Sequence, residues 1–264
     1  MAKVLAIANQ KGGVGKTTTS INLAASLATT RRKVLLIDLD PQGNATMGSG
    51  VDKADLEYSV YELLTGQCNL QQALRKTGKA GFDLLPANAD LTAAEVELLD
   101  MTRREQRLRD ALADVRERYD YIIIDCPPSL NMLTVNGLVA ADSVIIPMQC
   151  EYYALEGLSA LVKTIQRIGQ TLNPSLQIEG LLRTMYDPRN SLTQDVSAQL
   201  AEHFADKLYK TVIPRNVRLA EAPSHGLPAL LYDRQSRGAE AYLALAGELV
   251  RRNRLAARQA ATAN

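Results

Sequence analysis

The eight residues from Lys11 to Thr18 read KGGVGKTT and carry the clearest chemical signal in the chain. An apolar, strand-like run (4–8) precedes them, and a helical apolar period (21–28) follows. A glycine-rich loop between a strand and a helix directs several backbone N–H groups into one concavity, and the helix N-terminus adds partial positive charge. Such a loop favours a polyphosphate, with Lys16 reaching the β- and γ-phosphates and the Thr17 hydroxyl binding magnesium.

The loop departs in one place from the usual pattern G-x-x-x-x-G-K-[ST]. Gln10 stands where the first glycine belongs, and a second lysine, Lys11, lies inside the loop. Glycine-rich turns between a strand and a helix also occur without any ligand, but here eight consecutive positions and both flanking elements agree. We therefore expect the chain to bind a nucleoside triphosphate and magnesium. The expected contacts are Lys11, Gly12, Gly13, Val14, Gly15, Lys16, Thr17 and Thr18.

Two aspartates follow apolar runs that read as strands. Asp40 begins the turn Asp-Pro-Gln-Gly after the run 34–37, and Asp125 ends the run Ile-Ile-Ile-Asp. An acid at the carboxyl end of a strand is often only a turn or helix cap. Beside a phosphate loop, however, it can orient magnesium-bound water, as a Walker-B aspartate does. We expect Asp40 and Asp125 to join Thr17 at the metal, and Asp40 to position the attacking water.

Composition narrows the class of protein. The chain has 264 residues, of which 46% are hydrophobic and 22% charged, and its net charge is only +1. No apolar run approaches the ~20 residues that span a bilayer, and the N-terminus lacks an apolar signal segment, so a cytosolic protein is expected. Cys68, Cys126 and Cys150 are widely spaced, which suggests neither a disulfide framework nor a zinc site.

Strand-like runs alternate with helical periods along the whole chain. The strand candidates are residues 4–8, 34–37, 82–85, 121–124, 143–147, 178–184 and 208–213, and the helical periods include 104–119, 155–172 and 239–257. Continuous apolar runs such as Ile122-Ile123-Ile124 suit strands that are buried on both faces. The pattern predicts an α/β fold: one domain over 1–264, with a mostly parallel, twisted sheet and helices on both faces. Ligands gather at the carboxyl ends of the strands in such folds.

Together these motifs resemble the deviant Walker A ATPases, specifically the ParA/Soj partition ATPases. The similarity covers nearly the whole chain and includes five stretches, KGGVGKTT (11–18), DLDPQGN (38–44), YIIIDCPPSL (121–130), PMQCEYYALEGL (147–158) and VIPRNVRLAEAPSHG (212–226). The resemblance implies ATP binding, a nucleotide-sandwich homodimer, binding of double-stranded DNA without sequence preference, and slow ATP hydrolysis stimulated by a ParB partner. It also implies that Lys11 crosses the dimer interface and acts with Lys16 and Asp40 in catalysis.

The resemblance also suggests where the base and DNA bind. The loop with Pro214 and Asn216 would meet adenine, because Asn216 has the amide groups that read a base edge; the alternative is a turn in which Asn216 caps a helix. Between residues 207 and 237, six lysines and arginines face only two acids. The expected DNA contacts are Arg189 and Arg218, supported by Arg215, Lys210 and Arg237, although any one of these could instead form a surface ion pair.

Other members of the superfamily fit less well. MinD-type relatives carry a C-terminal amphipathic membrane helix, but here the apolar side beyond Leu255 is mostly alanine. The cysteine positions do not match the cluster ligands of nitrogenase iron proteins. A regulatory module, in which nucleotide switches partner affinity and turnover is incidental, stays open. The presence of both Asp40 and Asp125 favours a true ATPase. The resemblance implies that it associates with the nucleoid and not with a membrane.

Overall fold

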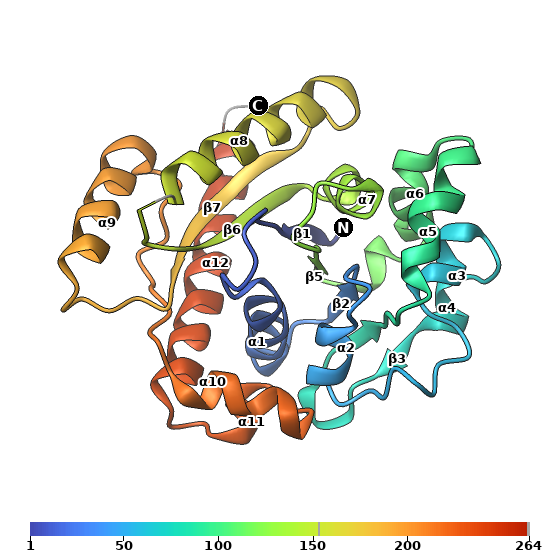
Figure 1. Ribbon diagram of the computed structural model, residues 1–264, viewed down its shortest axis with the longest axis horizontal. Helices are drawn as coiled ribbons and strands as arrows, with labels where there is room; N and C mark the ends of the chain where they lie inside the picture. Colours follow the sequence, from blue (N-terminus) through green and yellow to red (C-terminus); the bar gives the residue numbers. More distant parts are fainter. Residues whose placement is uncertain (153, 263–264) are drawn as a thin grey trace.

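The computed structural model describes residues 1–152 and 154–262, and in that part of the chain a seven-stranded sheet forms the centre of the molecule (Figure 1). The strand order is β3-β4-β2-β5-β1-β6-β7, and all neighbours are parallel except β3 and β4. This confirms the expected α/β fold with a mostly parallel sheet. The strands are β1 (Lys3–Ile7), β2 (Val34–Asp38), β3 (Arg75–Lys76), β4 (Asp83–Leu85), β5 (Tyr121–Asp125), β6 (Ser143–Gln149) and β7 (Gln177–Thr184).

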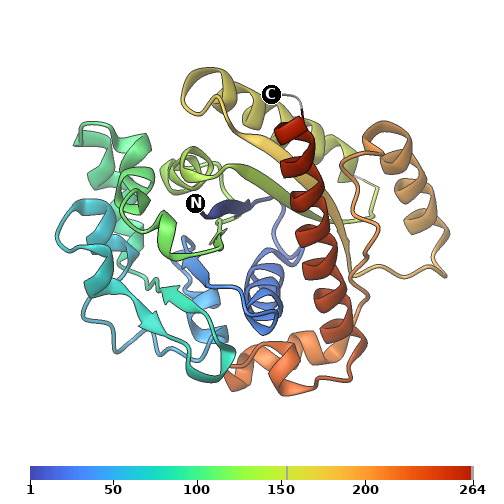
Figure 2. The same ribbon diagram turned by 180° about the vertical axis from the view of Figure 1, so that it is seen from behind.

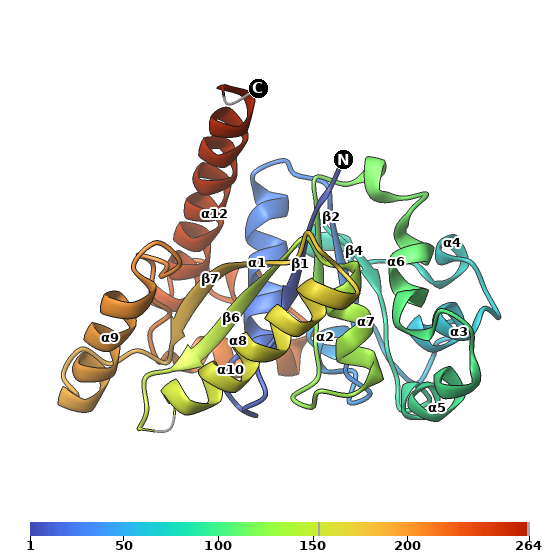
Figure 3. The same cartoon turned by 90° about the horizontal axis from the view of Figure 1, so that it is seen from above.

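Helices cover both faces of the sheet (Figures 1 and 2). One face is covered by α1 and α12, which pack against each other, and the other by α7 and α8 with the helices around them. Viewed from above, α12 extends past the end of the sheet (Figure 3). The helices are α1 (Lys16–Thr29), α2 (Asn44–Gly48), α3 (Val60–Thr65), α4 (Leu70–Ala73), α5 (Leu91–Glu97), α6 (Arg107–Leu112), α7 (Met132–Ala140), α8 (Ala154–Thr171), α9 (Ser191–Phe204), α10 (Val217–Glu221), α11 (Ala229–Tyr232) and α12 (Arg237–Thr262).

The apolar runs of the strands are continuous because each strand contributes side chains to the hydrophobic cores on both faces of the sheet. Successive side chains of a strand point to opposite faces of the sheet. In β1, Leu5 and Ile7 join the core under α1 and α12, whereas Val4 and Ala6 join the core under α7 and α8. All four side chains are fully buried. Helices on both faces therefore require the two-sided apolar strands that the sequence shows.

Strand register brings the ends of β1, β2 and β5 to one level. Asp38 of β2 is the Cα partner of Asp125 in β5, and Ile7 of β1 is its partner on the other side. The phosphate-loop segment follows β1 directly, so it leaves the sheet beside both aspartates. The three sequence motifs thus meet at the carboxyl edge of the sheet, as expected for this architecture.

The expected strand over 208–213 is wrong. This segment runs beside β7, with isolated bridges at Leu208 and Pro214, but it forms no continuous ladder. The side chain of Glu248 in α12 takes two of its backbone donors, because its carboxylate accepts the N–H groups of Lys210 and Thr211, each at 2.9 Å. The segment keeps separate backbone bonds to β7, such as those of the Tyr209 and Ile213 N–H groups, while the helix carboxylate takes the donors between them.

Smaller differences concern element boundaries. The helical period over 104–119 is broken: α6 covers only 107–112, and short 3₁₀ turns lie on either side. Arg116 explains the second break, because its carbonyl accepts the N–H of Ala2 at 2.8 Å and its guanidinium pairs with Asp142 at 2.7 Å. These contacts tie the segment to the start of β1. The two-residue strand β3 was not expected, since nothing in Arg75-Lys76 reads as a strand.

The cysteines are all free thiols, with Cys126 and Cys150 buried and Cys68 half-buried. Burial raises the pKa of each thiol, most strongly that of Cys126. Within the described ranges, no helix has the length and apolar character needed to cross a membrane.

The contacts of Glu248 lead to a stability prediction. Besides two N–H groups, its carboxylate accepts the Thr211 hydroxyl at 2.7 Å and pairs with Arg252 at 2.8 Å. Burial opposes the ionisation of Glu248, but these hydrogen bonds outweigh it and lower its pKa. We expect Glu248→Gln to lower the free energy of unfolding by about 1–3 kcal/mol, since charged hydrogen bonds to partly buried donors are lost. Denaturant titration measures this, with the exposed Glu240→Gln on the same helix as the control. Equal stability of the two variants would contradict the prediction.

Candidate functional site

The loop between β1 and α1 has the backbone of a phosphate cradle. Gly13 and Gly15 adopt left-handed conformations, with φ of 73° and 85°, which side chains rarely tolerate. Gly15 is the N-cap of α1, and no side chain caps this helix. The N–H groups of the first turn are therefore left for a ligand. A Cβ placed on Gly12 or Gly13 would meet no atom within 4 Å, so the space above the loop is open.

The two lysines of the loop lie in different surroundings. Lys16 is buried, and its Nζ donates to the carbonyl oxygen of Lys11 at 3.2 Å. Burial lowers the pKa of Lys16, and the nearby charges of Asp125 and Asp40 oppose that shift. Lys11 extends to the surface, where about half of its side chain is exposed and its ammonium pairs with Glu151. The Lys16 ammonium is thus held over its own loop, whereas the Lys11 ammonium lies at the exposed rim of the loop.

Asp125 joins the end of β5 to the first turn of α1. Thr17 Oγ1 donates to one carboxylate oxygen, Oδ2, at 2.8 Å, and Ser20 Oγ donates to the other, Oδ1, at the same distance. The carboxyl group is fully buried, and burial raises the pKa of Asp125 despite these two hydrogen bonds. The contact between Thr17 and Asp125 brings two of the three expected magnesium ligands together.

Two residues of this site were missed by the sequence analysis. Asp38, the partner of Asp125 in strand register, is fully buried and accepts hydrogen bonds from the Thr46 N–H and hydroxyl, each at 2.8 Å. Burial and the charge of Asp125 raise the pKa of Asp38. Ser20 is the other. Its signal was the spacing from Thr17, because residues three apart share one face of a helix.

Asp40 lies two residues beyond β2 and is partly buried. Its Oδ1 accepts the N–H of Gln42 at 3.0 Å, so it organises the turn that follows the strand. Its charge acts on both Lys16 and Asp125, which places it beside the loop. The second carboxylate oxygen of Asp40, Oδ2, forms no hydrogen bond within the described chain.

The acids of the site suit a divalent cation held together with phosphates. Asp38 and Asp125 are two buried carboxyls at neighbouring strand positions. Burial is the main cause that raises the pKa of each, and a nearby negative charge adds to it, that of Asp125 for Asp38 and that of Asp40 for Asp125. A cation would offset this repulsion. Magnesium usually takes one or two protein oxygens and completes its shell with phosphate and water. Thr17 and Asp125 would supply the protein oxygens, with Asp40 close by. When bound, magnesium would neutralise negative charge on the β- and γ-phosphates.

A mostly apolar cavity of about 190 Å³ adjoins the loop. Pro214 and Asn216, the two expected base contacts, line it together with Gly15 and Thr18 of the loop and Tyr242 of α12. Asn216 is also the N-cap of α10, since its Oδ1 accepts the N–H of Arg218 at 3.1 Å. Its amide N–H₂ remains available to a ligand. The cap and the cavity contact therefore use different atoms of one side chain.

The expected DNA-contact residues lie on loops and helix starts near the cavity, with Arg218 in α10 and Arg237 at the start of α12, and two of them form ion pairs. Arg189 binds Asp187 through two N–H groups, at 2.8 and 2.9 Å, and Arg218 pairs with Glu221 at 2.7 Å and Asp233 at 3.3 Å. A bridge between Tyr186 and Pro214 brings the two loops together. Arg215 lines the cavity, and Lys210 and Arg237 flank this region along the chain.

Comparisons with known proteins identify the family. A family model described as an AAA domain matches residues 2–178. The sporulation initiation inhibitor protein Soj of Bacillus subtilis is 56% identical over 94% of this chain and 98% of its own. The chromosome partitioning protein ParA of Caulobacter vibrioides is 53% identical over 96% of this chain and 95% of its own. The chain belongs to the ParA/Soj family. The resemblance seen in the sequence is thereby confirmed, and the chain is an ATPase of the ParA/MinD type.

Solved structures agree with membership of the ParA/Soj family. A cobyrinic acid a,c-diamide synthase from Mycobacterium smegmatis, solved with ADP and magnesium and with an ATP analogue and magnesium, is 42% identical, with 95% of each chain covered and a TM-score of 0.82. The cell division ATPase MinD of Pyrococcus furiosus is 26% identical over 95% of this chain and 99% of its own, with a TM-score of 0.79. The expected cofactors, ATP and magnesium, are those of a solved relative.

The hydroxyl of Ser20 offers a test of the site that needs no ligand. Ser20→Ala removes a hydrogen bond from the fully buried Asp125, and we expect it to cost about 1–3 kcal/mol of the free energy of unfolding. Ser26→Ala is the matched control, because the buried Ser26 hydroxyl on the same helix has no hydrogen-bond partner in the described chain. Chemical denaturation compares the two. A loss in Ser26→Ala as large as that in Ser20→Ala would contradict the assigned contact.

Proposed function

We propose that this chain is a DNA-partition ATPase that works as an ATP-dependent homodimer in the cytoplasm, on the nucleoid. ATP and magnesium would bind at the loop through residues 11–18, Asp40 and Asp125, with adenine in the cavity lined by Pro214 and Asn216. The dimer would bind double-stranded DNA without sequence preference. Hydrolysis, stimulated by a ParB-type centromere-binding protein, would return it to monomers.

The observation that carries this proposal is the difference in position between the side chains of Lys11 and Lys16. Lys16 is buried over its own loop, whereas the Lys11 ammonium lies at the exposed rim with Glu151. Phosphoryl transfer requires added positive charge on the phosphate oxygens. A rim lysine can supply that charge to a second copy of the loop and need not serve its own. ATP binding and dimerisation would then be linked.

The proposed dimer leads to a prediction for a substitution at Gly12. A side chain on Gly12 has open space in the single chain, so Gly12→Val should fold and bind ATP normally. In a dimer with facing loops, the same side chain would meet the other copy. We expect this variant to stay monomeric with ATP in sedimentation velocity runs, whereas the parent chain dimerises. ATP titration of the variant is the control, and ATP-dependent dimers of Gly12→Val would refute the facing-loop arrangement.

The proposal of DNA binding rests on two exposed arginines near the cavity, Arg189 on a loop and Arg218 in α10. The side chains of Arg189 and Arg218 are 87% and 45% exposed, and their carboxylate partners are within three residues, apart from Asp233. DNA phosphates can compete for such exposed pairs, which contribute little to stability. Two copies of this surface in one dimer would double the phosphate contacts, each of which releases counterions. DNA affinity would therefore depend on ATP and fall with salt.

This interface predicts a specific loss on charge reversal. Arg189→Glu and Arg218→Glu should each weaken binding to double-stranded DNA by about tenfold or more at moderate salt, because each dimer loses two phosphate contacts and gains repulsion. ATP binding and dimerisation should persist. Arg103→Glu is the control, since Arg103, in the segment before α6, is also exposed and pairs with an acid, Asp110 of α6. Filter binding at several salt concentrations measures this, and full affinity in both variants would exclude these residues.

The whole cycle is tested by ATP turnover. We expect slow hydrolysis by the chain alone and faster hydrolysis when DNA and an N-terminal peptide of a ParB-type protein are added together. Asp40→Ala should bind ATP and dimerise but not turn over, because Asp40 would position the attacking water. Normal turnover in Asp40→Ala would leave Asp40 with only its turn contact to Gln42. If the rate of ATP turnover did not change when DNA and peptide were added, the alternative of a nucleotide-switched regulatory module would be favoured.

A further inference from the structure

A second cavity lies at the opposite end of the sheet from the phosphate loop. It has a volume of about 600 Å³ and is lined by residues from the turns that precede β2 and β5 and from the edge pair β3 and β4. Arg32 and Lys33 immediately precede β2, and Arg118 and Tyr119 precede β5. The cavity is therefore at the amino ends of strands whose carboxyl ends carry Asp38 and Asp125. None of the loop residues 11–18 lines it.

Positive charge dominates this cavity. Five of its lining residues are basic, and Asp83 is the one acid among them; the basic residues are Arg32, Lys33, Arg75, Lys76 and Arg118. Asp83 is already occupied, since its carboxylate pairs with Lys76 at 2.7 Å and accepts the Tyr119 hydroxyl at 2.8 Å. Outside the lining, Asp120 contacts Arg32 at 3.8 Å. The acids nearby thus offset only two of the five positive charges.

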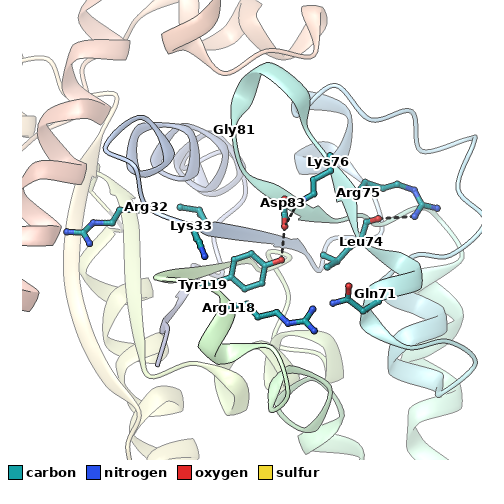
Figure 4. A pocket seen from close by; sticks show the side chains of 11 residues that line it. Arg32, Lys33, Gln71, Leu74, Arg75, Lys76, Gly81, Asp83, Arg118 and Tyr119 are labelled. Atoms are coloured by element: carbon teal, nitrogen blue, oxygen red, sulfur yellow. Dashed lines mark hydrogen bonds and ion pairs between the residues drawn. The ribbon is translucent and has the colours of Figure 1, made fainter.

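Lys33 and Arg118 are the cations that remain unpaired. Neither side chain forms an ion pair or a hydrogen bond within the described chain, and both are exposed. Figure 4 shows them on either side of the Tyr119 ring, with the Arg118 guanidinium directed toward Gln71. Arg32 and Arg75 extend away from this centre, and Arg75 donates to backbone carbonyls. Lys33 and Arg118 would therefore make direct contact with an anion, while the other cations strengthen the local field.

We propose that this cavity is a second anion site, which binds a small ligand through a multiply charged phosphate group. Lysine and arginine donors around a hollow suit phosphate oxygens, and arginine can bind them with two parallel N–H groups. The shape favours a small ligand over duplex DNA, because the free cations line a concave pocket and do not form a protruding ridge. This site is separate from the nucleotide site and would allow a phosphorylated metabolite to act on the ATPase.

The cavity continues into a hollow suited to an organic group. Gln71 and Arg118 line both, and the second hollow, of about 500 Å³, also has Leu63, Cys68, Leu70 and Ala111 in its wall. Asp110 and Asp114 offset the charges of Arg107 and Arg118 in that wall, so the excess of positive charge, and with it the phosphate group, lies on the Lys33 side. A ligand with a phosphorylated end in the basic cavity and an apolar or aromatic end in the adjoining hollow would fit both.

Calorimetric titration with tripolyphosphate tests the site. The starting protein is Lys16→Ala, in which the loop has lost its main phosphate contact. We expect tripolyphosphate still to bind, with one site per chain. Adding Lys33→Gln and Arg118→Gln should weaken it about tenfold or more, since two charged donors are lost. Adding Lys163→Gln and Arg167→Gln instead removes the same charge from exposed positions on α8 and should leave affinity within about twofold.

Two results would overturn the proposal. One is the absence of tripolyphosphate binding to Lys16→Ala, which would place all binding at the loop. The other is equal affinity after the Lys33 and Arg118 substitutions, with circular dichroism confirming that the variants fold. Titrations with pyrophosphate, ADP and GDP then distinguish the sources of the phosphate. Tighter binding of a nucleotide than of pyrophosphate that is lost with Lys33→Gln and Arg118→Gln would assign its base to the second hollow, and equal binding would assign the site to phosphate alone.

Discussion

The elements around the site are positioned by contacts to two buried carboxyl groups, those of Asp38 and Asp125. Parallel pairing of β2 and β5 places them opposite each other, and burial makes their ionisation costly. Hydroxyl and N–H donors from Thr17, Ser20 and Thr46 hold them in place. The helix after the loop, the turn after β2 and the central strands are therefore fixed by one electrostatic constraint. A bound cation would relieve it, which links occupancy of the site to its rigidity.

Local patterns were sufficient for the phosphate loop and for the strand that ends at Asp125. Glycines at fixed spacing, flanked by a strand and a helix, determine the backbone of Gly13 and Gly15 without help from distant residues. Asp38 could not be found in the same way. Its role depends on the register between β2 and β5, whose partners are distant in the sequence. The sequence does show an acid there, but nothing local distinguishes it from Asp40.

The segment over 208–213 shows a second limit of sequence patterns. Its alternation of apolar residues is real, since Tyr209 and Ile213 are buried, yet Glu248 takes the backbone donors that a strand would need. The partner is on a helix some 40 residues away, so only the fold reveals it. Arg218 is an intermediate case. Its contact with Glu221 has helical spacing and could be expected, whereas its contact with Asp233 could not.

The place of β1 in the sheet has a consequence for synthesis. Strand β1 leaves the ribosome before the other strands of this sheet, yet its two neighbours are β5 and β6, so Lys3 cannot pair until Tyr121 has been made. At translation rates of about 5–20 residues per second, roughly ten seconds pass before the first neighbour exists. During that time the apolar residues 4–7, which end fully buried, have no sheet to join. The nascent chain therefore exposes this apolar segment until β5 has been made, and a chaperone that covers residues 4–7 would raise the yield of folded protein.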